Sequence, residues 1–88
     1  MRTRATSTFL KQLSALLDGV RERVEKFAFD ELPLLESLSD VINIKKLQGY
    51  KNCFRARFGD YRVGIEIENE VAVLRVVLHR RNIYRRFP

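Results

Sequence analysis

The chain contains very few of the residues that build disulfides and metal sites. Of its 88 residues one is cysteine, Cys53, and one is histidine, His79. A single cysteine excludes an internal disulfide and a cysteine-rich zinc site, and one histidine adds no obvious metal cluster. The sequence therefore predicts neither a metal ion nor another cofactor. A lone thiol fits a reducing compartment, and we expect the protein to be cytoplasmic.

Long apolar runs are also missing. No hydrophobic stretch approaches the roughly 20 residues that a membrane-spanning helix requires, so we expect no membrane partner. The hydrophobic fraction of 45% is nevertheless ordinary for a folded protein and too high for a disordered one. A length of 88 residues predicts one domain over 1–88, with little room for a second.

Negative charge is scarce in the second half of the chain. Residues 1–44 contain six Lys or Arg and seven Asp or Glu, a net charge of −1. Residues 45–88 contain eleven basic and four acidic residues, a net charge of +7. This asymmetry indicates a polyanionic partner such as RNA or DNA, or an acidic protein. Charge alone leaves open the alternative of a basic surface that only contacts solvent.

The first third of the chain has the periodicity of a helix. Apolar residues recur at spacings of three and four over residues 9–29, which predicts one apolar helix face. Ser7 or Thr8 is the expected N-cap, and Asp18-Gly19 the expected break. We therefore predict a helical hairpin or a kinked helix that covers one face of a sheet. Residues 2–5 are a weak candidate for an edge strand.

Residues 54–79 have the pattern of strands. Phe54–Phe58 alternates with period two, and Gly59-Asp60 suits a two-residue type II′ turn. This turn places Phe58 opposite Tyr61, Arg57 opposite Arg62 and Ala56 opposite Val63. A second turn near Asn69-Glu70 places Ile67 opposite Ala72, Ile65 opposite Leu74 and Val63 opposite Val76. The predicted polar face then carries the following residues: Arg55, Arg57, Arg62, Gly64, Glu66 and Arg75.

Two arginines facing each other across a strand pair lower stability. Arg57 and Arg62 are such a pair in the predicted first hairpin. A sequence that accepts this repulsion is expected to bind a negatively charged partner on that face. Gly64 lies beside these arginines and would leave room for a ligand near the backbone.

Three motifs resemble a known family. They are Lys46–Gly49, Gly59–Val63 and His79–Tyr84, which read KLQG, GDYRV and HRRNIY. Over residues 7–84 the chain resembles the RelE/ParE superfamily of bacterial toxins, and its ending is more similar to the RelE branch. The resemblance implies an α+β fold, with two N-terminal helices packed on a three- to four-stranded antiparallel sheet. RelE-branch toxins cleave messenger RNA, usually in the ribosomal A site.

The RelE pattern also implies site residues. It places basic residues on Arg55 and Arg57, arginines at Arg62 and Arg80, and a tyrosine at Tyr84, with Arg81 a neighbouring alternative to Arg80. The chain departs from some relatives, which have lysines where Arg55 and Arg57 stand. An arginine cannot lose its proton in a protein, so a role as base must pass to another group here.

RNA cleavage without a metal uses the ribose 2′-hydroxyl as nucleophile, and each of these residues is a candidate for one step of that reaction. Arg57, Arg62 and Arg80 are suited to hold the phosphate and stabilise its charge. Tyr84 is a candidate general base or a residue that orients a nucleobase. His79 is a further acid or base candidate, because histidine alone has an ordinary pKa near neutrality, although a structural role is equally compatible with its place. The additional RNA contacts expected are Arg55, Lys45, Lys46, Lys51, Arg75 and Arg81.

The resulting hypothesis is a metal-independent endoribonuclease, the toxin of a type II toxin–antitoxin system. Its expected partners are mRNA, the ribosome, and a cognate antitoxin in a heteromeric complex. Leucines within residues 32–38 are a candidate antitoxin surface. One alternative is a ParE-like inhibitor of DNA gyrase without nuclease activity, and another is an RNA-binding protein without enzymatic activity. The fold does not distinguish them.

Overall fold

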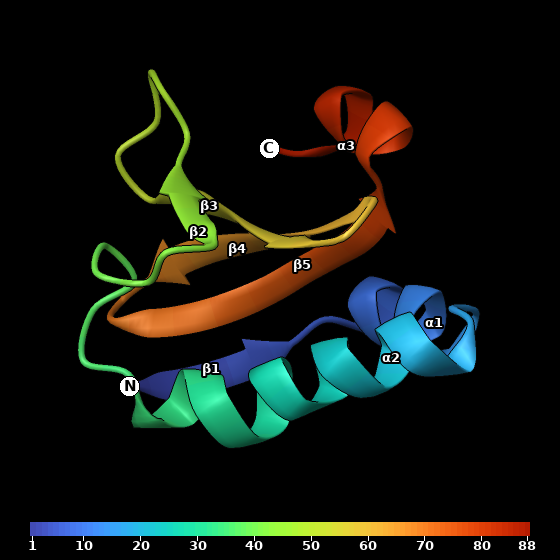
Figure 1. Ribbon diagram of the computed structural model, residues 1–88. Coiled ribbons are helices and arrows are strands. Elements are labelled where there is room, and N and C mark those ends of the chain that lie inside the picture. The colour runs from blue at the N-terminus through green and yellow to red at the C-terminus, as the bar shows by residue number, and fades with distance from the viewer.

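The computed structural model describes all 88 residues, which form a twisted sheet with helices on both faces (Figure 1). The strands are β1 (Arg2–Ala5), β2 (Ile44–Lys46), β3 (Cys53–Phe58), β4 (Tyr61–Glu68) and β5 (Val71–His79). The α-helices are α1 (Ser7–Ser14), α2 (Asp18–Glu25) and α3 (Arg80–Arg86). After α2 the chain continues as a π-helical segment, Lys26–Glu31, and a 3₁₀ turn, Leu32–Leu34. Helices α1 and α2 lie on one side of the sheet and α3 on the other.

The α+β architecture is confirmed, but the sheet differs from the expected one. It has five strands in the order β1-β5-β4-β3-β2, and β1 runs parallel to β5. The weak edge strand at residues 2–5 therefore forms, and a second edge strand, β2, lies within residues 39–53, whose sequence has no strand pattern and indicates a connection into the sheet. Both are short and pair on one side only, so neither needs the long alternating pattern that marks β3 and β4.

The first hairpin has the predicted register. Arg57 lies opposite Arg62 and Phe58 opposite Tyr61, and Gly59 has a φ of +59°. The second turn also forms at Asn69-Glu70, both with positive φ, and Ile65 lies opposite Leu74 as predicted.

Beyond Leu74 the predicted register of the second hairpin is wrong. A bulge leaves Arg75 without a partner, so Val63 faces Val77 and not Val76. One extra residue in a strand moves every later side chain to the other face. Val76 therefore lies on the face of Gly64.

The N-terminal helices begin and end near the predicted positions. Thr6, one residue before the predicted caps, is the N-cap of α1, and its Oγ1 accepts a hydrogen bond from the Phe9 N–H at 3.0 Å. The same hydroxyl donates to the Arg75 carbonyl at 2.9 Å, which ties α1 to the bulge in β5. The break lies at residues 15–17, so Asp18 begins α2 rather than ending α1.

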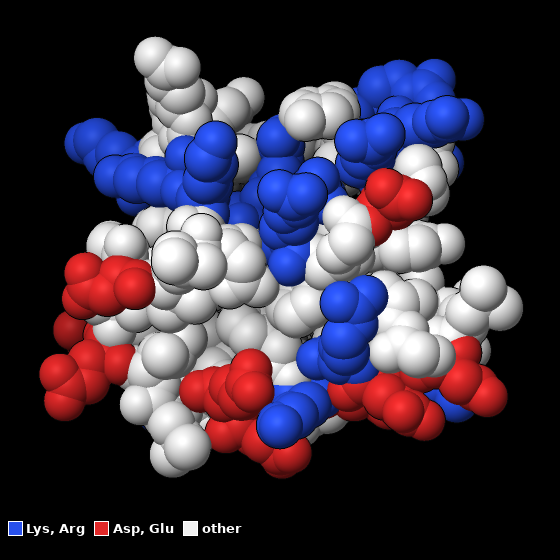
Figure 2. Space-filling view, in the orientation of Figure 1, with Lys and Arg blue, Asp and Glu red and all other residues white.

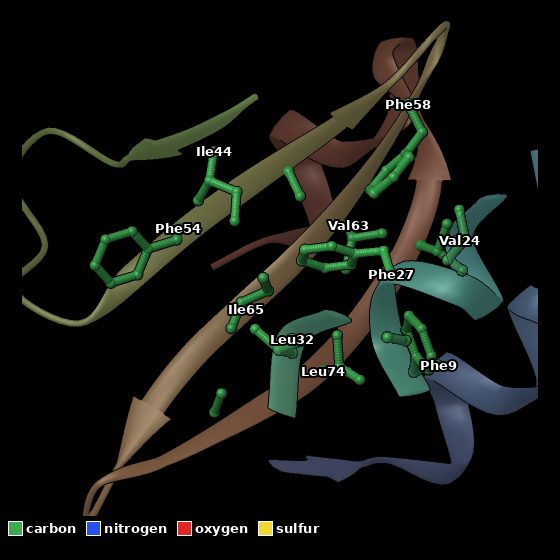
Figure 3. Packing of buried hydrophobic residues seen from close by; sticks show 14 of the residues in the cluster. Phe9, Val24, Phe27, Leu32, Ile44, Phe54, Phe58, Val63, Ile65 and Leu74 are labelled. Atoms are coloured by element: carbon green, nitrogen blue, oxygen red, sulfur yellow. The ribbon is translucent and has the colours of Figure 1, made fainter. Parts of the chain in front are cut away.

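The main core fills the space between the sheet and the N-terminal helices (Figure 3). Phe9, Phe27 and Leu32 point from the helical side toward Val63 and Leu74 on the sheet. All five are almost completely buried, with no more than 3% of their surface exposed. The ring of Phe27 also packs against that of Phe58, with centroids 5.2 Å apart. Most of the predicted helix face therefore packs in the core, whereas Leu10 and Leu17 of that face are exposed.

A smaller core holds α3 on the opposite face of the sheet. Ile83 and Phe87 are buried against Cys53, with Val76 and Leu78 packed around them. Phe87 lies directly over Gly64: a Cβ atom on Gly64 would meet the Phe87 ring at 2.7 Å. The glycine thus makes room for a side chain of the same protein and not for a ligand. No helix of the chain is long and apolar enough to span a membrane.

Candidate functional site

A basic groove lies on the face of the sheet that α3 only partly covers. We define it by a cavity of about 330 Å³ between β2, β3, β4 and α3. Its lining residues are Ile42, Asn43, Lys45, Lys46, Leu47, Gln48, Arg55, Arg57, Arg62 and Tyr84. Five of the ten are Lys or Arg and none is acidic. Figure 2 shows the basic residues gathered over the half of the molecule that contains β2 and α3, whereas most acidic residues in this view lie over the other half, which contains α2 and the segments that follow it.

The strand register brings the basic side chains of the groove together. Lys45 on β2 lies opposite Arg55 on β3, and Arg57 on β3 lies opposite Arg62 on β4. Alternation along β3 places Arg55 and Arg57 on the same face. Four positive charges therefore share a small area with no carboxylate among the lining residues, which favours an anionic ligand.

Arg62 is oriented by the turn of the first hairpin. Its Nη1 donates hydrogen bonds to the carbonyls of Gly59 at 2.7 Å and Tyr61 at 2.9 Å. The backbone of Arg57 is also held, since its N–H donates to the Asn43 carbonyl at 2.8 Å and its carbonyl accepts from Asn43 Nδ2 at 3.0 Å. The Arg57 side chain itself is exposed and belongs to no ion pair. One arginine is thus fixed at the turn, and the other is free to move onto a ligand.

Tyr84 reaches the groove from α3. The buried neighbours Ile83 and Phe87 fix the helix, while 70% of the Tyr84 surface remains exposed. The guanidinium carbon of Arg55 lies 4.4 Å from the centre of the Tyr84 ring, within the range of a cation–π contact. The structure therefore brings together four predicted site residues from β3, β4 and α3: Arg55, Arg57, Arg62 and Tyr84.

His79 and Arg80 lie outside the groove lining. His79 faces Tyr61 across the sheet, on the side opposite Arg62, with ring centroids 5.5 Å apart. Its Nδ1 accepts a hydrogen bond from the Arg81 N–H at 3.1 Å and so caps α3. Arg80 is bound to the hairpin turn, through its N–H to the Asp60 carbonyl at 2.7 Å and its Nε to the Asp60 carboxylate at 3.8 Å. Both residues join α3 to the turn.

The remaining predicted RNA contacts are scattered. Lys45 and Lys46 line the groove, whereas Lys51 is exposed in the loop between β2 and β3 and Arg81 is exposed on α3. Arg75 lies apart from the groove. It forms ion pairs with Glu66 at 2.8 Å and Glu68 at 2.6 Å, so its charge is already balanced.

Sequence patterns indicate only in part the wall of the groove that β2 and its flanking residues form. Ile42, Asn43, Leu47 and Gln48 line this wall, whereas only the lysines of the segment are predicted to contact RNA from the sequence. Two signals point to this segment: the predicted RNA contacts Lys45 and Lys46, and the family motif Lys46–Gly49. Asn43 is the informative member, since its hydrogen bonds hold β3 beside β2.

The thiol of Cys53 is buried beside the groove, under α3. Burial raises the pKa of the Cys53 thiol above its ordinary value of 9.0; the carboxylate of Glu66 raises it further, and Arg75 lowers it. Cys53 is 2% exposed and packs under α3. It is therefore a packing residue rather than a reactive thiol.

Comparisons with known proteins agree with this architecture. The family model described as the ParE toxin of the type II toxin–antitoxin system parDE matches residues 4–84. Toxin RelE3 of Methanocaldococcus jannaschii is 39% identical over 89 residues, which cover all of both chains.

Two solved structures extend the comparison. The RelB–RelE antitoxin–toxin complex of Methanococcus jannaschii contains a chain that is 38% identical, with a TM-score of 0.79 over 97% of this chain and 99% of that one. The RelBE2 complex of Mycobacterium tuberculosis contains one that is 29% identical, with a TM-score of 0.64 over 89% and 95%. The chain therefore belongs to the RelE/ParE superfamily of type II toxin–antitoxin toxins, on its RelE-like branch.

Proposed function

We propose that this protein is a toxin that cleaves mRNA on the ribosome, in the cytoplasm, without a metal ion. The observation that carries the proposal is the groove itself, which has five basic residues, no acidic residue and an exposed tyrosine at its edge. Such a groove offers a binding site for a phosphodiester backbone and a group that can contact the ribose or the base. The RelE names of its relatives agree with this choice.

Arg57 and Arg62 are the proposed phosphate-binding residues. Both hydrogen bonds from Arg62 to the turn use Nη1, which leaves Nη2 for a phosphate oxygen. Arg57 is exposed and can add a second fork of donors. Together they would stabilise the charge that grows on the phosphoryl oxygens in the transition state.

The reaction then proceeds through the ribose next to the scissile phosphate. The 2′-oxygen forms a bond to phosphorus and loses its proton to a base, while the bond from phosphorus to the 5′-oxygen breaks and that oxygen gains a proton. The products are a 2′,3′-cyclic phosphate and a 5′-hydroxyl. Tyr84 is the proposed side chain nearest to this chemistry, as base or as the residue that orients the nucleotide. His79 is not proposed for this task because its ring packs against Tyr61 and lies outside the groove lining, with its Nδ1 capping α3.

A cognate antitoxin is the proposed protein partner. Related toxins have been solved as complexes with RelB antitoxins, and the basic groove would accept acidic antitoxin side chains in place of phosphates. Among the leucines of residues 32–38, Leu32 and Leu38 are core residues, whereas Leu34 is 83% exposed. Leu34 is therefore the member of that segment that we propose to contact the antitoxin.

The test compares two exposed strand arginines. Brief expression in bacteria, followed by mapping of new RNA 5′ ends, should reveal cuts within translated frames. Arg57→Gln should reduce cutting by about 100-fold, the typical loss for one charge-stabilising donor. Arg2→Gln, at the opposite edge of the sheet, should leave cutting unchanged.

Intact RNA with arrested growth would contradict the nuclease proposal. A gyrase supercoiling assay would then test the ParE-like alternative. The matching family model is described as a ParE toxin. Intact RNA with normal growth would indicate a chain that lacks toxin activity altogether.

A further inference from the structure

We infer that Arg55 is a positioning residue that holds the Tyr84 ring, and that it does not itself bind the scissile phosphate. The effect of Arg55 on cleavage rests on the proposed nuclease function, whereas its contact with Tyr84 rests on geometry alone. Arg55 lies in the centre of the groove floor, between Lys45 on β2 and Gly64 on β4. Its guanidinium is directed at the ring of Tyr84, 4.4 Å from the ring centre.

The Arg55 side chain has no other charged or hydrogen-bonding partner within the protein. Its Nε is buried and finds no protein acceptor. Glu66, the nearest carboxylate along that face of β4, is already taken by Arg75 at 2.8 Å. The face of the tyrosine ring is therefore the principal electrostatic partner of this half-buried cation, and the contact is stronger where water is partly excluded.

Tyr84 depends on this contact in return. Its neighbours Ile83 and Phe87 are buried and fix the backbone of α3, but the Tyr84 ring is 70% exposed and makes no hydrogen bond of its own. A ring on a fixed backbone still rotates about its side-chain bonds. Arg55 packs against one face of the ring and restricts that rotation, which favours one orientation of the other face and the hydroxyl toward RNA.

Two roles for Arg55 predict different kinetics. If it acts through Tyr84, Arg55→Gln should lower cleavage roughly tenfold in the wild-type background, as expected for a partly desolvated cation–π contact. In a Tyr84→Leu background the same change should then cost less than about twofold, since the ring it holds is absent. If Arg55 binds phosphate, the full loss should persist in both backgrounds. Arg57→Gln is the matched control and should cost the same factor in both.

Nuclear magnetic resonance provides the readout that does not depend on activity. The ring current of Tyr84 should shift the Arg55 Hε and Hδ signals upfield, and Tyr84→Leu should abolish that shift. Tyr50→Leu, which removes an exposed tyrosine from the loop between β2 and β3, should leave the signals in place. Tyr84→Phe should also preserve them, because the ring remains.

The outcomes separate this inference from the function on which it rests. Coupled losses in the cleavage cycle together with a Tyr84-dependent shift support it. The inference is overturned if Arg55→Gln lowers cleavage by the same factor in both backgrounds. It is also overturned if Tyr84→Leu leaves the Arg55 chemical shifts unchanged. If the wild-type protein cleaves no RNA, the proposed function fails by itself, and the Arg55 signals still decide whether Arg55 holds the ring.

Discussion

Gly64→Ala is the change that tests most sharply how α3 is held. The added methyl group would lie 2.7, 2.8 and 2.9 Å from three carbons of the Phe87 ring. Ordinary contacts of this kind begin at about 3.4 Å, so the ring must move by roughly 0.7 Å or leave its site. The Gly64 backbone cannot yield, because β4 is paired on both sides.

The expected cost is about 1–3 kcal/mol of the free energy of unfolding, the usual penalty for an extra methyl group in a packed site. Urea denaturation of both proteins measures it directly. Gly19→Ala is the control: a Cβ on Gly19, in α2, meets nothing within 4 Å. That change should be neutral or stabilising by up to about 1 kcal/mol, since alanine is the better helix former.

A double substitution tests whether the lost stability comes from the contact between the new methyl group and the Phe87 ring. In the background Phe87→Ala, which removes the ring, Gly64→Ala should become nearly neutral, so that the two effects are strongly non-additive. A Gly64→Ala protein as stable as wild type would refute the packing of Phe87 against β4. An equal cost in both backgrounds would refute it as well.

Three further predictions concern stability. Thr6→Ala should cost about 1 kcal/mol in urea denaturation because it removes the N-cap of α1, whereas the exposed Ser7→Ala should change little. Arg75→Gln should cost about 1 kcal/mol at low salt, with a smaller difference at high salt, because it removes the shorter ion pairs of Glu66 and Glu68 and leaves Glu68 only its 3.9 Å contact with Arg4. The raised pKa of Cys53 means that the folded thiol keeps its proton to higher pH than the unfolded one. This contribution is complete below pH 9.0 and is lost as pH rises through the folded pKa. Wild type should therefore lose stability above that pH more steeply than Cys53→Ala, by up to about 1.4 kcal/mol per pH unit.

Local signals predicted the parts of the fold that depend on neighbouring residues. Gly59-Asp60 fixes the first hairpin, because glycine at positive φ and a two-residue loop leave one register. The bulge at Arg75 was not predictable in this way. Val76, Val77 and Leu78 are all apolar, since α3 covers the second face of β5, and a continuous apolar run hides which residue points where.

Local sequence patterns predict the part of the candidate groove that lies on β3 and β4. The alternation of Arg55 and Arg57 and the turn before Arg62 suffice to bring these residues together. Tyr84 required the family resemblance, because its place depends on how α3 returns over the sheet. For His79 the sequence leaves open both an acid–base role and a structural one, and the fold adds that its Nδ1 caps α3.

The most direct test of the central claim uses purified protein and a translated message with one substitution. The position of the main cut is first mapped, and a second message is then made with a 2′-deoxyribose on the 5′ side of that bond. We expect cleavage of the natural message, with a 2′,3′-cyclic phosphate at the new end, and no cleavage at the substituted position. Equal cutting of both messages, or none of either, would contradict it.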